Sequence, residues 1–425
     1  MGKKCLMKLL CISLIVVGII CKNIPNKYFD QRDLSDSISK IDSRSCSSEE
    51  FTKLTGKYGY PTESHFVTTK DGYILQMFRI QKKHTPIKRG LKPVILQHGL
   101  IDSSDNWVLN DEDKSLAFLL ANLGYDVWIP NSRGNQYSIS HKDIKTTSAK
   151  FWDFSFSEMG RYDVPAIIAY VLEVSGFNKL IYVGHSQGTT AFFSALTDPV
   201  SSRYVNSRIE KFIALGPVVY LANMQNTFFD IFVRHSEPVA ALIRLVGVHE
   251  LFPGSCSTST ASSFLMKELC TLAKGLCNFG MTVAEFNPVY ENQDRWPEFA
   301  DHHPCGTSDK TLFHFQQLSQ CPKNDPCFRM YDYGKKGNLE HYGQATPPDY
   351  DFSRIQVPIS FFMGKEDNLG NVVDNTMFQN KLRALGKQFN SYTYDNWGHM
   401  TFMWGKNPYR VFDDIVREIS GNKDL

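Results

Sequence analysis

The stretch Gly184-His185-Ser186-Gln187-Gly188 decides the fold. It directly follows the apolar run LIYV (180–183) and directly precedes TTAFFSAL (189–196), which we expect to be helical. The segment therefore predicts a strand, a sharp turn and a helix in immediate succession. Two glycines permit such a turn without Cβ clashes, and the serine between them is then presented at the carboxyl end of the strand.

Short apolar runs alternate with helical stretches on both sides of this turn. Such alternation predicts an α/β fold with a mostly parallel central sheet flanked by helices. Upstream, Asp71-Gly72 lies between HFVTT (65–69) and YILQMFRI (73–80), which predicts a β-hairpin at an antiparallel edge. The expected strands are 93–97, 125–129, 180–184, 212–216, 358–364 and 391–395, and the expected helices lie near 114–123, 163–175, from 188 and near 408–419.

The alternation stops after Pro217 and resumes near residue 351. Residues 218–350 are helical and loop-like in pattern and rich in aromatic residues, which predicts an inserted, mainly helical cap or lid. The core would then consist of two parts, residues 51–217 and 351–422. Two apolar stretches, 227–233 and 240–248, are either buried core or the apolar surface of a mobile lid.

The N-terminus predicts entry into the secretory pathway. A basic start is followed by LLCISLIVVGIIC (9–21), an apolar run of 13 residues. A bilayer span needs about 20 apolar residues, so we expect residues 1–21 to be a signal peptide, with an uncleaved anchor as the alternative. Residues 22–50 are polar, and we expect a linker or a removable pro-segment there.

Charge and cysteine content limit the possible partners. The net charge is about +2, from 46 basic and 44 acidic residues, so nothing in it favours nucleic acid as a partner. An odd number of cysteines follows residue 21, so at least one thiol stays free in an oxidising compartment, and CPKNDPC (321–327) can close a small loop. No zinc spacing occurs among them, and we expect no metal. These cysteines are Cys46, Cys256, Cys270, Cys277, Cys305, Cys321 and Cys327.

The serine of the turn needs a base to become a nucleophile, and the base needs a carboxylate to orient it. In folds with this turn, the chain order is serine, acid, histidine. His399 follows the last expected strand and is our candidate base. The candidate acid follows PISFFMG, where spacing does not separate Glu366, Asp367 and Asp374.

A tetrahedral intermediate also needs two backbone N–H donors for its oxyanion. The residue after the nucleophile, Gln187, supplies the first. The loop after PVILQ, which reads His98-Gly99-Leu100, stands where the second donor is expected, so the N–H of Leu100 is our candidate. We expect His98 to brace this loop rather than to react.

At this point the motifs show a resemblance to a known family. The chain resembles the acid lipases, the gastric and lysosomal family of α/β-hydrolases, over roughly residues 50–420. The resemblance implies Ser186 as nucleophile, Asp367 as acid, His399 as base, and Leu100 with Gln187 as the oxyanion hole. The matching segments include YGYP (58–61), DGYIL (71–75), LQHGL (96–100), GYDVW (124–128), NSRGN (131–135), FSFSEMGRYDVPA (154–166), YVGHSQGTT (182–190), GTS (306–308) and VPI (357–359).

The resemblance implies a secreted or lysosomal enzyme that works at acid pH and needs no cofactor. Its substrates would be triacylglycerols or cholesteryl esters, taken from a lipid–water interface beneath a mobile cap, and no stable protein partner is implied. The chain departs from the family pattern at Pro130, at HMTF (399–402), in the spacing of its cap cysteines and in lacking the usual glycosylation sites. Acyl preference and acid tolerance therefore stay open.

Two other functions remain to be tested against this one. A membrane-anchored steryl ester hydrolase would keep residues 9–21 attached, whereas a secreted enzyme would lose them. A non-catalytic lipid-binding protein on the same fold would not need the serine, histidine and aspartate together.

Overall fold

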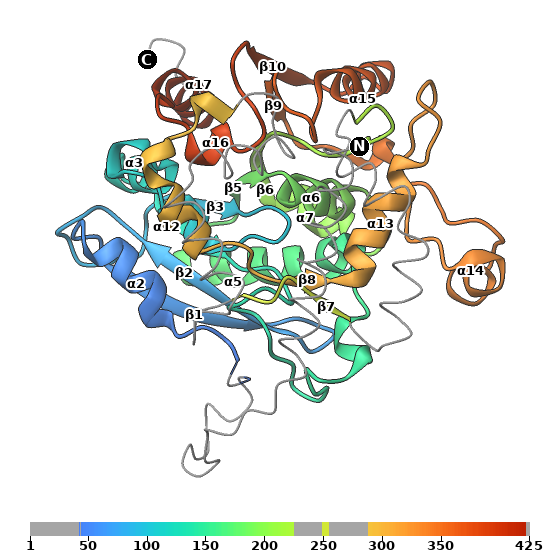
Figure 1. Ribbon diagram of the computed structural model, residues 1–425, viewed down its shortest axis with the longest axis horizontal. Helices are drawn as coiled ribbons and strands as arrows, with labels where there is room; N and C mark the ends of the chain where they lie inside the picture. Colours follow the sequence, from blue (N-terminus) through green and yellow to red (C-terminus); the bar gives the residue numbers. More distant parts are fainter. Residues whose placement is uncertain (1–41, 43, 225–248, 255–287, 422–425) are drawn as a thin grey trace, which may run out of the picture.

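The computed structural model describes residues 42, 44–224, 249–254 and 288–421, and it is built around one eight-stranded sheet (Figure 1). The strand order is β1-β2-β4-β3-β5-β6-β9-β10. The strands are β1 (Thr62–Thr68), β2 (Ile74–Ile80), β3 (Pro93–Gln97), β4 (Asp126–Pro130), β5 (Leu180–His185), β6 (Ile209–Leu215), β9 (Ile359–Gly364) and β10 (Phe389–Tyr394).

The sheet confirms the predicted α/β-hydrolase class. From β4 to β10 all neighbouring strands run parallel, whereas β1 and β2 form an antiparallel hairpin at one edge. The turn of this hairpin contains Asp71 and Gly72, as expected. Strands β3, β4, β5 and β9 are buried along their whole length, which is typical of parallel strands covered on both faces.

Each face of the sheet carries its own hydrophobic core, because side chains alternate along a strand. On β5, Leu180 and Tyr182 point into one core, and Ile181 and Val183 point into the other. The first core is covered by α4 (Phe156–Glu158), α5 (Val164–Ser175), α6 (Gln187–Thr197), α7 (Ser202–Arg208) and α15 (Val372–Ala384). The second is covered by α2 (Ser48–Gly56), α3 (Leu116–Asn122), α12 (Trp296–Asp301), α16 (Thr401–Trp404) and α17 (Tyr409–Ser420).

The described part of residues 218–350 adds short elements beside the sheet. They are β7 (Glu250–Leu251), β8 (Thr307–Ser308), α12, α13 (Asp309–Ser319) and α14 (Gly334–Tyr342). A disulfide joins Cys321 to Cys327 and closes the small loop that the sequence suggested. Cys305 is free and buried, so the expected free thiol is present.

Several expectations lie outside the described residues. They are the leader at 1–21, most of the linker at 22–50, the apolar stretches 227–233 and 240–248, and Cys256, Cys270 and Cys277. The division into core and cap therefore stays a prediction. None of the described helices is long and apolar enough to span a membrane.

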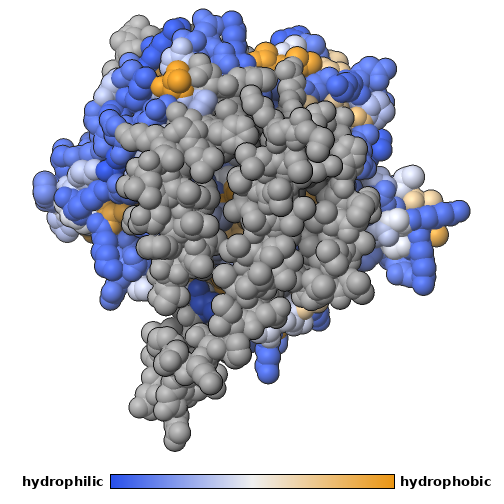
Figure 2. All heavy atoms as spheres, viewed as in Figure 1, coloured by the Kyte–Doolittle hydropathy of each residue, from blue (hydrophilic) through white to orange (hydrophobic). Residues whose placement is uncertain are grey.

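The described surface seen in Figure 2 is mostly hydrophilic, with small groups of hydrophobic residues among the polar ones. Scattered apolar side chains are normal on a protein surface and indicate no particular partner. Among the described residues, the exposed large hydrophobic ones are Phe66, Leu123, Val200, Phe252, Val289, Leu339, Val373, Leu385 and Tyr409.

Candidate active site

Ser186 occupies a strained turn between β5 and α6. Its backbone has φ 53° and ψ −123°, a region that non-glycine residues rarely adopt and that costs about 1–3 kcal/mol. A Cβ on Gly188 would lie 2.6 Å from the carbonyl oxygen of Gln97, and one on Gly184 would lie 2.9 Å from the backbone of Gly188. Only glycine therefore fits at these two positions, as the sequence predicted.

His399 and Asp367 form a buried hydrogen-bonded pair. The Nδ1 atom of His399 lies 2.9 Å from Oδ2 of Asp367, and the two residues are 2% and 1% exposed. The other carboxylate oxygen, Oδ1, accepts backbone hydrogen bonds from Leu369 at 2.8 Å and Gly370 at 2.7 Å. The carboxylate is thus held on both oxygens, and its orientation is determined by the loop that follows β9.

The other two acids that spacing left open do not contact His399. Asp374 lies in the first turn of α15, where its carboxylate accepts hydrogen bonds from Asn223 and Asn371. Glu366 is partly exposed. Among the three candidates, the structure places only Asp367 beside the histidine.

Ser186 and His399 are both buried, and they follow the carboxyl ends of β5 and β10, which β6 and β9 separate in the sheet. Gly216, which directly follows β6, lies close to both residues. The carbonyl of the preceding residue, Leu215, accepts the N–H of Ser186, and a Cβ on Gly216 would lie 3.2 Å from Nδ1 of His399. Nε2 of His399 is buried and has no hydrogen-bond partner among the described residues. The hydrogen bond from the serine hydroxyl to Nε2 is therefore not formed here, and such bonds are often long before substrate binds.

His185, the residue before the serine, was not singled out from the sequence. Its Nε2 lies 2.9 Å from the carbonyl oxygen of His399 and must carry the hydrogen, because a carbonyl only accepts. Burial and the nearby His399 lower the pKa of His185 to about 4. His185 therefore stays neutral at pH 5 and ties the His399 loop to the serine turn.

The loop after β3 lies directly against Ser186. A Cβ on Gly99 would come within 3.1 Å of the serine Cβ, so a side chain at this position would crowd Ser186. His98 orients the peptide that follows, because its Nε2 accepts the N–H of Ser132 at 3.0 Å and its Nδ1–H then donates to the carbonyl of Gly99 at 2.8 Å. In a planar trans peptide the C=O and N–H point in opposite directions, so the N–H of Leu100 points away from His98.

The second candidate donor stands at the start of α6. Gln187 is the first residue of this helix, and the first N–H groups of a helix have no partner within it. The structure therefore brings Ser186, Asp367, His399 and the two candidate oxyanion donors, Leu100 and Gln187, to one end of the parallel strands. The residue types that general acid–base and nucleophilic chemistry require are all present there.

Arg133 explains why three of the quoted motifs lie together. Its guanidinium, 1% exposed, pairs with Asp71 of DGYIL at 2.7 Å and with Asp163 of GRYDVPA at 2.5 Å. It also lies 3.9 Å from the ring of Tyr73. Burial and the nearby carboxylate of Asp71 raise the pKa of Asp163 to about 6, although the charge and hydrogen bonds of Arg133 oppose both effects.

Replacing Arg133 with methionine is expected to lower the free energy of unfolding by about 3–5 kcal/mol, because it leaves Asp71 and Asp163 without their buried partner. Urea denaturation followed by circular dichroism measures this. Arg329→Met is the control, because the Arg329–Asp349 pair is exposed and should contribute no more than about 1 kcal/mol. Equal losses in the two variants would contradict a structural role for the buried pair.

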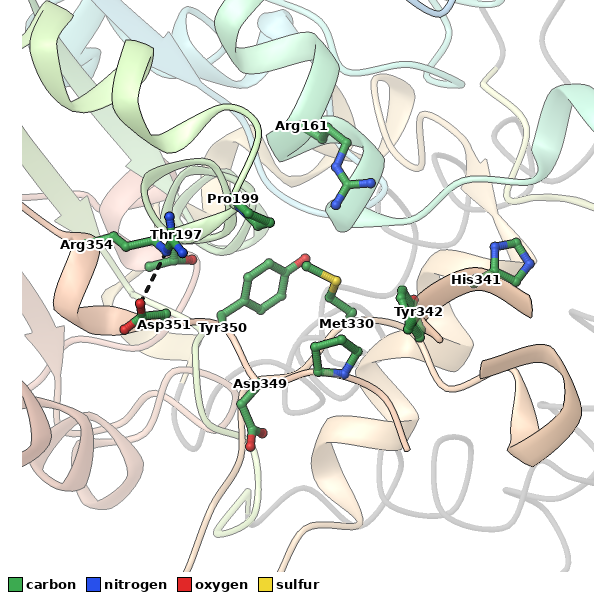
Figure 3. A pocket seen from close by; sticks show the side chains of 11 residues that line it. Arg161, Thr197, Pro199, Met330, His341, Tyr342, Asp349, Tyr350, Asp351 and Arg354 are labelled. Atoms are coloured by element: carbon green, nitrogen blue, oxygen red, sulfur yellow. Dashed lines mark ion pairs between the residues drawn. The ribbon is translucent and has the colours of Figure 1, made fainter. Parts of the chain in front are cut away.

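A cavity of about 290 Å³, lined by both polar and apolar side chains, lies apart from these residues (Figure 3). Its two arginines are already paired, Arg161 with Asp198 and Arg354 with Asp351. The residues that line it include none of the candidate catalytic residues, so we give it no part in the chemistry. They are Arg161, Thr197, Pro199, Met330, His341, Tyr342, Pro348, Asp349, Tyr350, Asp351 and Arg354.

Comparison with solved structures supports the fold. A soluble variant of monoglyceride lipase from Saccharomyces cerevisiae matches with a TM-score of 0.50 at 14% identity, and the match covers 85% of this chain and 95% of that one. Two family models also match, a partial alpha/beta-hydrolase lipase region at residues 51–111 and the alpha/beta hydrolase fold at residues 92–242.

Comparison with curated proteins identifies relatives that match over most of the chain. Lipase lipl-1 of Caenorhabditis elegans is 37% identical, over 85% of this chain and 89% of that protein. Human lysosomal acid lipase/cholesteryl ester hydrolase is 34% identical over 86% and 89%, and mouse gastric triacylglycerol lipase is 37% identical over 84% and 88%. Relatives that match over most of their length thus show an ester hydrolase, and the chain belongs to the acid lipase family of α/β-hydrolases.

Proposed function

We propose that this enzyme hydrolyses acyl esters of neutral lipids, with Ser186 as nucleophile, His399 as base and Asp367 as the residue that orients the base. The observation that supports this most is the buried hydrogen bond between His399 and Asp367 near the strained turn that presents Ser186. The three side chains come from the carboxyl ends of β5, β9 and β10, in the order serine, acid, histidine.

The reaction would proceed in two halves. Ser186 Oγ attacks the ester carbonyl carbon while Nε2 of His399 takes the hydroxyl proton. The resulting oxyanion accepts hydrogen bonds from the N–H groups of Leu100 and Gln187. When the intermediate collapses, the alcohol leaves with the proton from His399, and the acyl group remains on the serine.

Water completes the cycle. His399 removes a proton from water, the hydroxide attacks the acyl-enzyme, and the fatty acid leaves as Ser186 regains its proton. Throughout, Asp367 accepts the Nδ1–H of His399, which keeps a lone pair on Nε2 and stabilises the imidazolium when it forms. The buried position of both residues strengthens this interaction, because little water competes for it.

The substrate class is proposed from the relatives. Two of them are named for triacylglycerols and for cholesteryl esters, so we propose that this chain takes such lipids at a lipid–water interface. The relatives include lysosomal and gastric enzymes, which agrees with the secretory pathway, and we propose that the mature protein is lysosomal or secreted.

Hydrolysis of three substrates at pH 5 and pH 8 tests the proposal. They are a short-chain ester, a long-chain triacylglycerol emulsion and a cholesteryl ester, each with Ser186→Ala as the blank. We expect serine-dependent release of long-chain fatty acid, with the higher rate at pH 5. Hydrolysis of the short-chain ester alone at both pH values would contradict the lipid substrate class and leave a simple esterase.

A further inference from the structure

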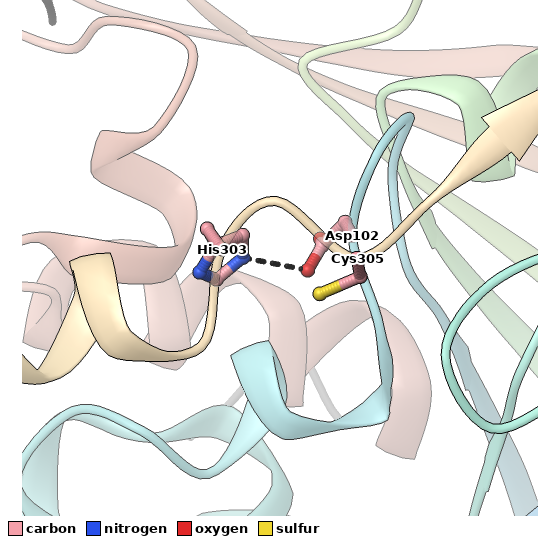
Figure 4. Close-up of side chains that lie close together, drawn as sticks. All are labelled: Asp102, His303 and Cys305. Carbon is pink, nitrogen blue, oxygen red and sulfur yellow. Dashed lines mark hydrogen bonds and ion pairs between the residues drawn. The ribbon is translucent and has the colours of Figure 1, made fainter. Parts of the chain in front are cut away.

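A second, mostly buried group of reactive side chains lies at residues 99–102 of the loop after β3, which we call the oxyanion loop (Figure 4). Asp102 comes from the loop after β3, and His303 and Cys305 come from the segment between α12 and β8. The ligand-type atoms of the three residues all lie within 4.8 Å of one another. None of the three has a role in the chemistry proposed above.

His303 faces a hydrogen-bond acceptor at each of its two ring nitrogens. Its Nδ1 lies 2.9 Å from the carbonyl oxygen of Phe299, and its Nε2 lies 2.9 Å from Oδ1 of Asp102. A carbonyl and a carboxylate both accept, so the ring donates to both of them in its imidazolium form, in which each nitrogen carries hydrogen. Burial alone would raise the pKa of Asp102, but the hydrogen bond and charge of His303 lower it to about 2.

The geometry favours an ion pair over a metal site. Two nitrogen or oxygen ligands of a tetrahedral zinc ion are roughly 3.3 Å apart, because each lies about 2.0–2.2 Å from the metal. The 2.9 Å between His303 and Asp102 is shorter and fits a direct charge-assisted hydrogen bond. The Cys305 thiol, in turn, donates to the carbonyl of His302 at 2.8 Å.

Asp102 connects this pair to the oxyanion loop. Its Oδ2 accepts the backbone N–H of Gly99 at 3.2 Å and the side-chain amide of Asn106 at 2.8 Å. Gly99 is the residue that lies against Ser186 and whose carbonyl belongs to the same peptide unit as the N–H of Leu100. The N–H that Asp102 holds belongs to the peptide unit before the one that carries the candidate oxyanion donor, and the two units share the Cα of Gly99, so a displacement of Asp102 would be passed to the donor through Gly99.

A second connection joins the same two segments. The backbone N–H of Cys305 donates to the carbonyl of Ile101 at 2.9 Å. Ile101 has φ 52°, a conformation that a β-branched residue adopts only when its surroundings hold it there. The oxyanion loop is thus strained and is held from outside by residues about 200 positions further along the chain.

We propose that the Asp102–His303 ion pair is a positioning device that holds the loop Gly99–Asp102 so that the N–H of Leu100 faces the reacting carbonyl. The proposal rests on the oxyanion role given to Leu100 above. Asp102 and His303 touch no substrate in this scheme. They act through Gly99, by keeping its peptide in place during the reaction, which avoids the cost of reorganising the donor.

Replacing His303 with alanine is expected to lower kcat for a soluble short-chain ester about 10- to 100-fold, with little change in KM, because the donor acts in the transition state. His303→Gln keeps a side-chain N–H that can donate to Asp102, so it should recover most of kcat. Steady-state kinetics, with active sites counted by a phosphonate that labels the serine, separates a slower enzyme from a smaller amount of folded enzyme.

His302→Ala is a matched control. His302 is the preceding residue, and it also pairs with a buried aspartate, Asp105, at 2.9 Å. Asp105 contacts Tyr137 and Gln136 rather than Gly99. Loss of the His302–Asp105 pair should therefore lower the thermal midpoint of unfolding but leave kcat unchanged. A drop of kcat in His303→Ala alone, recovered by glutamine, supports the positioning role.

The outcomes distinguish this proposal from the proposed function. If the wild type hydrolyses the ester and Ser186→Ala does not, while His303→Ala keeps the wild-type kcat, the positioning role is wrong and the catalytic scheme stands. Equal losses of kcat in His302→Ala and His303→Ala would also overturn it. Cobalt binding to the wild type, with a thiolate charge-transfer band that Cys305→Ala abolishes, would replace the ion pair with a metal site. An inactive wild type would overturn both proposals.

Discussion

Ester hydrolysis by Ser186→Ala is expected to fall by about 10⁴-fold or more in kcat/KM, because alanine has no oxygen to form the acyl-enzyme. The residual rate would come from the oxyanion donors and from binding alone. A soluble p-nitrophenyl ester gives the rate, and mass spectrometry after reaction with a phosphonate shows whether residue 186 is the labelled position.

A serine within α6 serves as the control for this prediction. Ser194 is fully buried, and its hydroxyl donates a long hydrogen bond to the carbonyl of Phe156, at 3.4 Å. Ser194→Ala should therefore change activity by no more than about 3-fold and leave the phosphonate labelling intact. Full activity of Ser186→Ala, or labelling at another residue, would show that the catalytic nucleophile lies elsewhere.

Much of the fold could be predicted because local patterns determine it. The apolar runs of β3, β5 and β9 end within one or two residues of their predicted positions. Burial on both faces of a parallel strand leaves a continuous apolar signal, and Asp71-Gly72 signals a hairpin directly. The serine turn was equally clear, because its glycines are required by the backbone atoms around them.

Contacts between distant segments could not be predicted in the same way. Asp102 and His303 are 201 positions apart, and neither residue has a spacing that indicates the other. His185 contacts the backbone of His399, which leaves no trace in side-chain patterns. The choice among Glu366, Asp367 and Asp374 likewise depended on where the loop after β9 turns, and spacing carries no information on that turn.

The acid offers the sharpest remaining test. Asp367→Asn is expected to lower kcat about 10⁴-fold while preserving the fold. The two backbone N–H groups of Leu369 and Gly370 both donate to Oδ1, so the asparagine carbonyl should take that position. Its amide NH₂ would then face Nδ1 of His399, which must become an acceptor. The ring hydrogen would move to Nε2, and His399 could no longer take the serine proton.

The neighbouring acids supply matched controls for this change. Asp374→Asn replaces the charged acceptor of the hydrogen bonds that Asn223 and Asn371 donate. The change should therefore lower the free energy of unfolding by about 1–2 kcal/mol and leave kcat within about 3-fold of wild type. Glu366→Gln, at a partly exposed position, should change neither quantity measurably. If Asp374→Asn or Glu366→Gln abolished hydrolysis while Asp367→Asn did not, the orienting role would belong to that acid. Because His399 contacts only Asp367 among the three, such a result would require the loop after β9 to rearrange when substrate binds.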